Sequence, residues 1–194
     1  MTKRVFIIHR WDGKPTSDWY PWLKKELEAK GLEVIVPEMP NAEEPKIEDW
    51  VNHLKSIVGI ADENTYFVGH SIGCQTIMRY LETLDEIVKV GGALFVAGWF
   101  CMKNLESEEV TEIAKPWLET PIDLKKVKNS LNYLTVILSK NDPYNCVKEN
   151  KEKFEKELNA DRVIVLKNEG HFTEDDGITE LPSALNSVLE LARE

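Results

Sequence analysis

The sequence contains few cysteines and no long apolar segment. Cys74, Cys101 and Cys146 are an odd number without the spacing of metal ligands, so we expect neither a disulfide framework nor a metal site. We interpret them as reduced thiols that serve mostly in packing. Every apolar segment is shorter than the ~18 residues needed to cross a bilayer, and the first is too short for the core of a secretion signal. These absences predict a cytoplasmic protein that is not inserted in a membrane.

Basic residues are also scarce relative to acidic ones. The chain has 24 Lys and Arg against 34 Asp and Glu, a formal net charge of -10 and a pI near 5.0. Nucleic-acid phosphates would be repelled by this charge, and no cluster of Lys and Arg overrides it. Small molecules or proteins are therefore the expected partners.

The length fits one folded unit. With 194 residues, 22.3 kDa and 42% hydrophobic residues, the chain can bury a substantial core, and we expect a single domain over residues 1–194. No internal repeat, low-complexity tract or linker interrupts it. The longest interval between predicted elements, residues 98–133, is too short for a second domain but long enough to fold over a site.

Six short apolar segments have the composition of β-strands, and amphipathic helical patterns separate most of them. Strands are expected at residues 5–8, 33–36, 65–68, 93–96, 134–138 and 163–166. Helices are expected at residues 19–30 and 47–58, directly after residue 71, around 147–158 and around 185–192. Short, continuously apolar strands joined by helices are typical of a parallel sheet covered on both faces. The fold class is therefore α/β, with ligands expected beyond the carboxyl ends of the strands.

One pentapeptide has the pattern of a nucleophile elbow. Gly69-His70-Ser71-Ile72-Gly73 lies between the third predicted strand and an amphipathic helix. The tight turn leaves no room for side chains two residues either side of the serine, which explains the glycines. The pattern occurs by chance in about one chain in twenty of this length. The prediction of a nucleophile elbow therefore depends on its position between a strand and a helix. The N–H of Ile72, in the first helical turn, is expected to stabilise an oxyanion.

Two further residues complete a catalytic set in the expected order. Asp142 follows the fifth strand and His171 follows the sixth, so both lie at the same end of the sheet as Ser71. A serine hydroxyl needs an imidazole to take its proton, and a carboxylate fixes the tautomer of that imidazole. We predict Ser71 as nucleophile, His171 as base and Asp142 as its orienting acid, without a metal or cofactor. The alternatives are a turn-initiating or helix-capping Asp142 and a surface-loop His171.

Other residues are candidates for the surroundings of this site. Trp11, in the loop after the first strand, is expected to supply the second oxyanion N–H. Trp99, Phe100 and Trp117 flank the longest connection and form either the wall of a substrate pocket or part of the core. His70 is expected to be packed and hydrogen-bonded rather than catalytic.

The motifs together resemble a known family. They are Ile7-Ile8-His9, Ser17-Asp18-Trp19, the elbow, residues 139–143 and Gly170-His171-Phe172. The chain resembles the small serine hydrolases of the α/β-hydrolase superfamily that include the human retinoblastoma-binding hydrolase and compact bacterial relatives. The resemblance implies a reduced fold of about six mostly parallel strands, with helices on both faces and little or no lid. It also implies the same roles for Ser71, Asp142 and His171.

One position departs from the superfamily pattern. Arg10 stands after His9, where glycine is common in the oxyanion loop, and its side chain is expected to narrow the site or bind an anionic group. The predicted function is cleavage of a small carboxylic ester, or of a thioester or amide, through an acyl-enzyme. The alternative is a non-catalytic protein-interaction module on the same scaffold, although none of the three cysteines lies in an LxCxE peptide. Carbon–carbon bond or peroxide chemistry on the same three residues also stays open.

Overall fold

A six-stranded sheet forms the centre of the computed structural model, which describes residues 2–193. The strand order is β2-β1-β3-β4-β5-β6, and every pairing between neighbours is parallel. The strands are β1 (Arg4–Ile8), β2 (Glu33–Ile35), β3 (Thr65–His70), β4 (Gly92–Val96), β5 (Leu134–Ser139) and β6 (Arg162–Leu166). All six predicted strands are therefore confirmed, and the mostly parallel sheet expected from the resemblance is wholly parallel.

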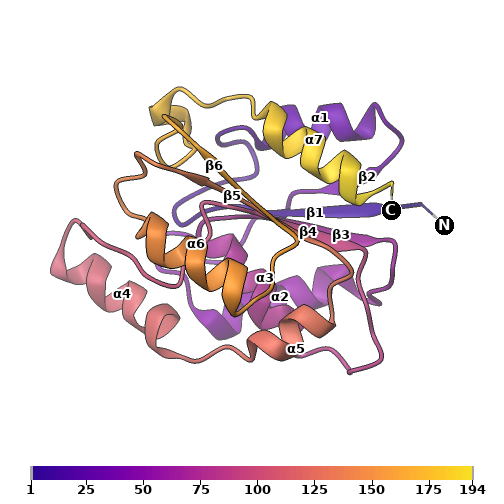
Figure 1. The fold of residues 1–194 in the computed structure, drawn as a ribbon, viewed down its shortest axis with the longest axis horizontal. Coiled ribbons are helices and arrows are strands. Elements are labelled where there is room, and N and C mark those ends of the chain that lie inside the picture. Colours follow the sequence, from indigo (N-terminus) through magenta and orange to yellow (C-terminus); the bar gives the residue numbers. More distant parts are fainter. Residues whose placement is uncertain (1, 194) are drawn as a thin grey trace.

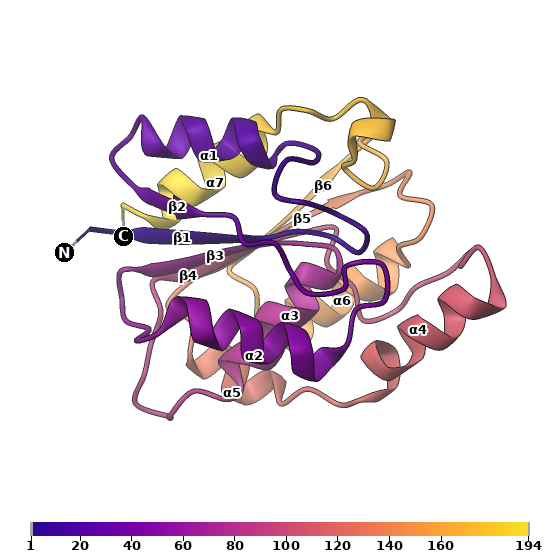
Figure 2. The ribbon, with the colours of Figure 1, turned by 180° about the vertical axis from the view of Figure 1, so that it is seen from behind.

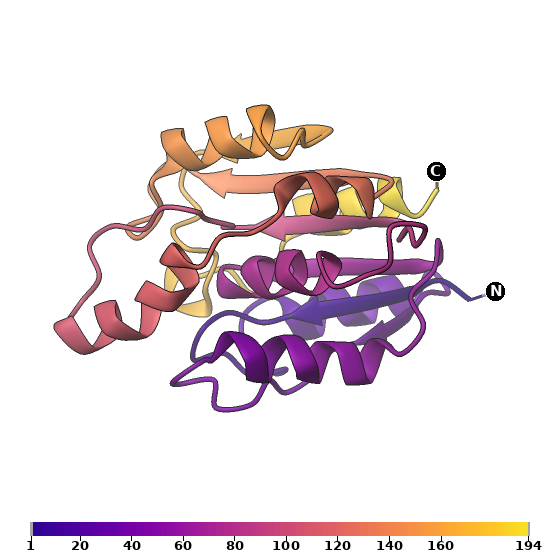
Figure 3. The same ribbon diagram turned by 90° about the horizontal axis from the view of Figure 1, so that it is seen from below.

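Helices cover both faces of this sheet (Figures 1 and 2). The helices are α1 (Tyr20–Glu28), α2 (Ile47–Val58), α3 (Ile72–Leu81), α4 (Glu108–Glu119), α5 (Leu124–Asn129), α6 (Val147–Lys156) and α7 (Pro182–Leu191). One face is covered by α1 and α7, and the other by α2, α3, α5 and α6. Seen from below, α4 lies beyond the carboxyl ends of the strands (Figure 3). No helix within residues 2–193 is both long enough and apolar enough to span a membrane.

The position of the site follows from the order of the strands. Each residue of the central strands β3 and β4 is buried, because helices pack on both sides of them. The chain first runs from β1 outward to β2 and then returns to place β3 on the other side of β1. This reversal creates a crevice beyond the carboxyl ends of β1 and β3, which is where ligands bind in such sheets. The predicted oxyanion loop follows β1 and the predicted elbow follows β3.

The prediction that all three cysteines are reduced is wrong for two of them. Cys101 and Cys146 form a disulfide, with their Cα atoms 5.6 Å apart, whereas Cys74 is a buried free thiol. The two bonded residues lie 45 positions apart in sequence, but they follow neighbouring strands and meet at the same end of the sheet. Met102 and Asn145 form an isolated antiparallel bridge beside them. Spatial proximity of this kind decides disulfide formation and leaves no signal in cysteine spacing.

Candidate active site

The turn at Ser71 has the strained backbone expected of an elbow. Ser71 has a φ of 54° and a ψ of -117°, and α3 starts at the next residue. A Cβ atom on Gly73 would lie 2.2 Å from the carbonyl oxygen of Ile8, and one on Gly69 would lie 2.7 Å from the backbone nitrogen of Cys74. Both neighbours are backbone atoms inside the fold, so only glycine fits at these two positions.

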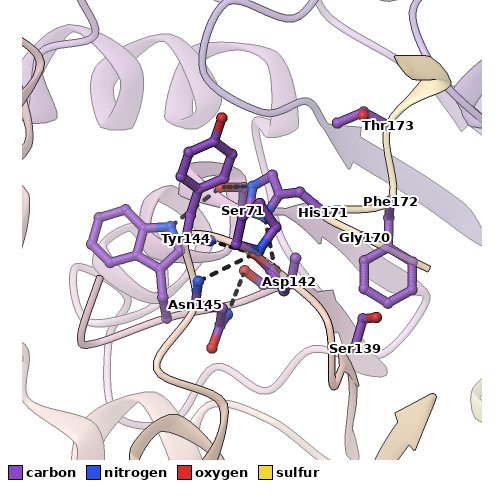
Figure 4. Close-up of polar contacts among 12 residues, drawn as sticks. Ser71, Ser139, Asp142, Tyr144, Asn145, Gly170, His171, Phe172 and Thr173 are labelled. Atoms are coloured by element: carbon purple, nitrogen blue, oxygen red, sulfur yellow. Dashed lines mark hydrogen bonds and ion pairs between the residues drawn. The ribbon is translucent and has the colours of Figure 1, made fainter. Parts of the chain in front are cut away.

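Ser71, His171 and Asp142 form one chain of hydrogen bonds (Figure 4). Ser71 Oγ lies 2.9 Å from His171 Nε2, and His171 Nδ1 lies 2.8 Å from Asp142 Oδ2. An ionised carboxylate only accepts, so Nδ1 carries the proton and Nε2 is free to accept from the serine hydroxyl. All three residues are more than 90% buried, at 4%, 8% and 3% exposure. The arrangement can withdraw a proton from the serine as its oxygen attacks a substrate.

The loops that carry Asp142 and His171 are each fixed by internal hydrogen bonds, and the Gly170 N–H donates to Asn141 Oδ1 between them at 3.0 Å. Asp142 Oδ1 accepts the N–H groups of Tyr144 and Asn145 at 3.0 and 3.1 Å, which fixes the carboxylate. On the base loop, His171 donates its N–H to Asp176 Oδ2 at 2.8 Å. Gly170 has a φ of 53°, and a Cβ there would collide with the Asp176 carboxylate. Glycine therefore precedes His171 for a steric reason, in addition to the chemical role expected of the histidine.

The two backbone N–H groups predicted to bind an oxyanion are those of Ile72 and Trp11. Within residues 2–193, neither the Ile72 nor the Trp11 N–H has an acceptor in the protein. His9 holds the loop that carries Trp11: its Nδ1 donates to the Arg10 carbonyl at 2.8 Å, and its Nε2 accepts the Met39 N–H at 3.0 Å. Burial lowers the pKa of His9, which keeps this imidazole neutral and able to do both.

The Arg10 side chain forms an ion pair with the buried carboxylate of Asp18. Its Nε donates to Asp18 Oδ2 at 2.8 Å and its Nη1 to the Trp11 carbonyl at 3.1 Å. Burial opposes ionisation of Asp18, but the hydrogen bond from Arg10 and the nearby charges outweigh it, and the pKa of Asp18 is lowered. Arg10 is among the residues that line the cavity in front of Ser71, and Asp18 neutralises most of its charge toward an anionic ligand.

A buried Tyr–His pair joins the oxyanion loop to the base loop. Tyr20 Oη accepts the Arg10 N–H at 3.1 Å and lies 2.6 Å from His70 Nδ1, and His70 Nε2 lies 2.8 Å from the His171 carbonyl oxygen. Because a carbonyl only accepts, His70 carries its proton on Nε2 and accepts the Tyr20 hydroxyl at Nδ1. Burial, and then the neighbouring His171, lower the pKa of His70 to about 3. His70 is therefore a neutral structural connector.

A cavity of about 400 Å³ opens in front of Ser71 and His171. Arg10 and Trp11 line it, together with apolar side chains that sequence analysis missed, namely Met102, Leu105, Val110, Pro143 and Tyr144. Four carboxylates also line it: Asp12, Glu106, Asp175 and Asp176. The Tyr144 hydroxyl donates to Glu106 at 2.6 Å, and this bond raises the pKa of Tyr144 to about 12. Most of the missed residues come from irregular segments, where no periodicity distinguishes a cavity wall from a surface loop.

The three aromatic pocket candidates are not among the residues that line this cavity: Trp99 and Trp117 are buried in the core, and Phe100 packs against that core. Trp99 is 1% exposed, and its indole N–H donates to Ser71 Oγ at 3.3 Å. Phe100 packs on Phe154, with ring centroids 4.9 Å apart. Trp117 is buried, with its indole N–H on the Pro45 carbonyl. Aromatic side chains that follow a central strand occur both in pocket walls and in the hydrophobic core, so their residue type alone does not distinguish the two positions.

The parallel sheet, the elbow after β3 and the order of the polar loops define the class of protein as an α/β-hydrolase. Solved structures agree. The YdeN protein of Bacillus subtilis superposes with a TM-score of 0.89 at 32% identity, over 100% of both chains. The esterase Est1E of Butyrivibrio proteoclasticus, solved with ferulic acid, gives 0.74 at 12% identity over 98% of this chain and 90% of its own. At that identity the second likeness shows the fold alone.

Sequence comparison leads to the family. The serine hydrolase family model matches residues 5–190. YdeN, named as a hydrolase, is 35% identical over 94% of this chain and 92% of its own. The serine hydrolase RBBP9 of Rattus norvegicus is 26% identical over 97% of this chain and 96% of its own. The chain belongs to the serine hydrolase family and is an enzyme of that class, which confirms the resemblance predicted from its motifs.

Proposed function

We propose that this serine hydrolase cleaves small carboxylic esters through Ser71, His171 and Asp142. The observation that carries the proposal is the unbroken hydrogen-bond chain from the serine oxygen to the buried carboxylate, with links of 2.9 and 2.8 Å. The tautomer required by Asp142 leaves His171 Nε2 as an acceptor, which is the state a general base needs.

The first half of the reaction forms an acyl-enzyme. Ser71 Oγ attacks the ester carbonyl carbon while its proton passes to His171 Nε2. The carbonyl oxygen becomes an oxyanion, which accepts the free N–H groups of Ile72 and Trp11. The bond to the leaving oxygen then breaks, and His171 returns the proton to that oxygen so that an alcohol departs. Each oxyanion donor contributes about 3–4 kcal/mol to lowering the barrier in comparable enzymes.

The second half releases the acid. Water takes the place of the alcohol, gives a proton to His171 and attacks the acyl carbon. The intermediate collapses with Oγ as the leaving group, His171 reprotonates Ser71, and the products are a carboxylic acid and an alcohol. A thioester or amide passes through the same steps with a different leaving atom.

The cavity supports a small-molecule substrate. Its volume of about 400 Å³ lies in the lower part of the range for small-ligand pockets. Its apolar part, which includes Met102, Leu105 and Val110, suits an uncharged hydrocarbon group next to the ester. Turnover of a panel of p-nitrophenyl esters of increasing chain length measures which hydrocarbon group fits best.

Active-site labelling tests the assignment of the nucleophile. A fluorophosphonate probe should label the wild type and Ser56→Ala, which removes an exposed serine, but not Ser71→Ala. Turnover of p-nitrophenyl esters should be lost in His171→Ala. Labelling of Ser71→Ala refutes the assignment. A folded wild type that is neither labelled nor active on any ester instead favours the protein-interaction module.

A further inference from the structure

We propose that Trp99 is a further catalytic residue, whose indole N–H stabilises the charge that develops on Ser71 Oγ. This inference rests on the proposed role of Ser71 as nucleophile. The indole nitrogen lies 3.3 Å from the serine oxygen, and the side chain is almost wholly buried. Within residues 2–193 this indole N–H has no other acceptor. It therefore donates to the atom that would react.

The direction of each hydrogen bond at Ser71 Oγ follows from its partners. A tryptophan indole can only donate, so the Trp99 bond takes one lone pair of the oxygen. His171 Nε2 is the acceptor for the serine proton, because Nδ1 donates to Asp142. A hydroxyl oxygen has two lone pairs, so the second stays free to attack a carbonyl carbon. The Trp99 bond is thus compatible with attack and restricts the rotation of the serine side chain.

Trp99 is held in place before any substrate binds. Its carbonyl oxygen accepts Gln75 Nε2 at 2.7 Å, and the preceding Gly98 carbonyl accepts Asn145 Nδ2 at 3.0 Å. Gln75 belongs to α3, the helix that starts at the elbow, and Asn145 is bonded to the Asp142 carboxylate. The backbone that carries the indole is therefore bonded to both sides of the site, and the indole itself is buried, which is the arrangement required of a preorganised charge stabiliser.

The bond should strengthen as the reaction proceeds. When the serine proton moves to His171, Oγ carries negative charge until its bond to carbon is complete, and a charged acceptor binds an N–H more strongly than a neutral one. The same charge returns to Oγ when it leaves in the second half of the reaction. Trp99 is not among the residues lining the cavity, so it acts on the transition state and not on substrate affinity.

The experiment compares two buried tryptophans in the full-length protein. Trp99→Phe removes the N–H but keeps an aromatic ring. The matched control is Trp50→Phe, since Trp50 in α2 is equally buried and donates its N–H to the Pro40 carbonyl at 2.7 Å. The measurements are kcat and KM with p-nitrophenyl butyrate, and the rate constant of fluorophosphonate labelling.

We expect Trp99→Phe to lower both kcat and the labelling rate constant by about 10- to 100-fold, with KM within about twofold of the wild type. Trp50→Phe should keep both rates within about twofold. A Trp99→Phe variant with unchanged kcat, or with only KM raised, overturns the inference. If the probe still labels Ser71 in the wild type, that result leaves the proposed function intact. An unlabelled wild type overturns both.

A second variant covers the case in which Trp99→Phe does not fold. Replacing Trp99 by 3-benzothienylalanine keeps the bicyclic shape and exchanges only the N–H for sulfur. The same fall in kcat at unchanged KM supports the donor role, because packing is preserved. Wild-type rates in this variant overturn it.

Discussion

At the scale of single residues, His70 is the point where the two halves of the site meet. It receives the Tyr20 hydroxyl at Nδ1 and gives its Nε2 proton to the His171 carbonyl, and Tyr20 in turn holds the Arg10 N–H. Every donor in this series has one acceptor, so a second proton on His70 would leave the Tyr20 hydroxyl without its acceptor. The loop that carries Trp11 and the loop that carries His171 are therefore aligned only while His70 is neutral.

The depressed pKa of His70 predicts that stability falls as the solution is acidified. The unfolded chain takes up a proton on this residue near pH 6.5, whereas the folded protein resists it down to about pH 3. Folding stability contributed by the neutral ring is complete above pH 6.5 and is lost progressively below it, by up to about 1.4 kcal/mol per pH unit.

Urea unfolding at several pH values between 5 and 6.5 measures this effect, in a window where few carboxylates titrate. The wild type should lose stability more steeply on acidification than His70→Gln, whose amide cannot titrate. His9, whose pKa is also lowered, contributes equally to both proteins. Equal slopes for the two proteins contradict the prediction.

At the scale of elements, the segment from Cys101 to the start of α4 is fastened to the loop that carries Asp142. The disulfide to Cys146 is reinforced by the Lys103 N–H on the Tyr144 carbonyl at 2.8 Å and by the Asn104 side chain on the Pro143 carbonyl at 2.8 Å. The same segment supplies much of the apolar cavity wall. Opening the disulfide should thus loosen the substrate wall as well as the fold.

Removing the disulfide should therefore lower stability and weaken substrate binding. For a sequence separation of 45, loop-closure entropy gives about 4 kcal/mol, and observed effects are commonly about 2–4 kcal/mol. The double variant Cys101→Ser, Cys146→Ser and the reduced wild type should unfold at similarly lower urea concentrations and show a raised KM for p-nitrophenyl hexanoate. Cys74→Ala serves as the control that still responds to reductant.

Thiol counting in denaturant checks the premise. The oxidised protein should show one free thiol, from Cys74, and the reduced protein three. Three thiols without reductant contradict the disulfide. Because disulfides are rare in the cytosol, the same count on protein taken directly from its cell tests the predicted cytoplasmic location.

The elements differ in how far the sequence predicts them. Buried parallel strands such as β3 and β4 are largely continuous apolar segments, and the apolar residues of α2 and α3 recur with the helical period. The positions of these four elements can therefore be predicted from the sequence. Helices α4 and α5 were not predicted, because α4 buries only Ala114 and Trp117 and α5 is a short turn. Their signals were the N-caps, Ser107 before α4 and Asp123 before α5.

The site divides in the same way. Ser71, Asp142 and His171 are predicted from the sequence because strand ends and the glycine pattern mark their positions along the chain. The contact between Trp99 and Ser71, the Tyr20–His70 connection and the disulfide depend on which loops meet in space. Such contacts between distant residues carry no local periodicity, so a single sequence does not reveal them.

At the scale of the whole molecule, charge should select among esters. In a chain with a net charge of -10, four carboxylates line the cavity, whereas the Arg10 cation that also lines it is paired with Asp18. A negative field of this kind repels anionic substrates and also repels the carboxylic acid that the proposed reaction releases. The enzyme should therefore prefer uncharged esters for a reason independent of the fit of the acyl chain.

The comparison uses two esters with the same six-carbon acyl chain, p-nitrophenyl hexanoate and the p-nitrophenyl monoester of adipic acid. At low salt the neutral ester should have a higher kcat/KM by about three- to tenfold beyond any difference in chain fit, and the ratio should shrink at 0.5 M salt as the charges are screened.

The double variant Asp12→Asn, Asp175→Asn should reduce the ratio. Glu63→Gln with Glu86→Gln makes the same change in net charge in loops before β3 and β4, at the far end of the sheet, and should leave it unchanged. An electrostatic field that selects substrates must weaken when its charges are screened or removed. If the kcat/KM ratio of the two esters changes neither with salt nor in the Asp12→Asn, Asp175→Asn variant, the preference is therefore due to chain fit alone.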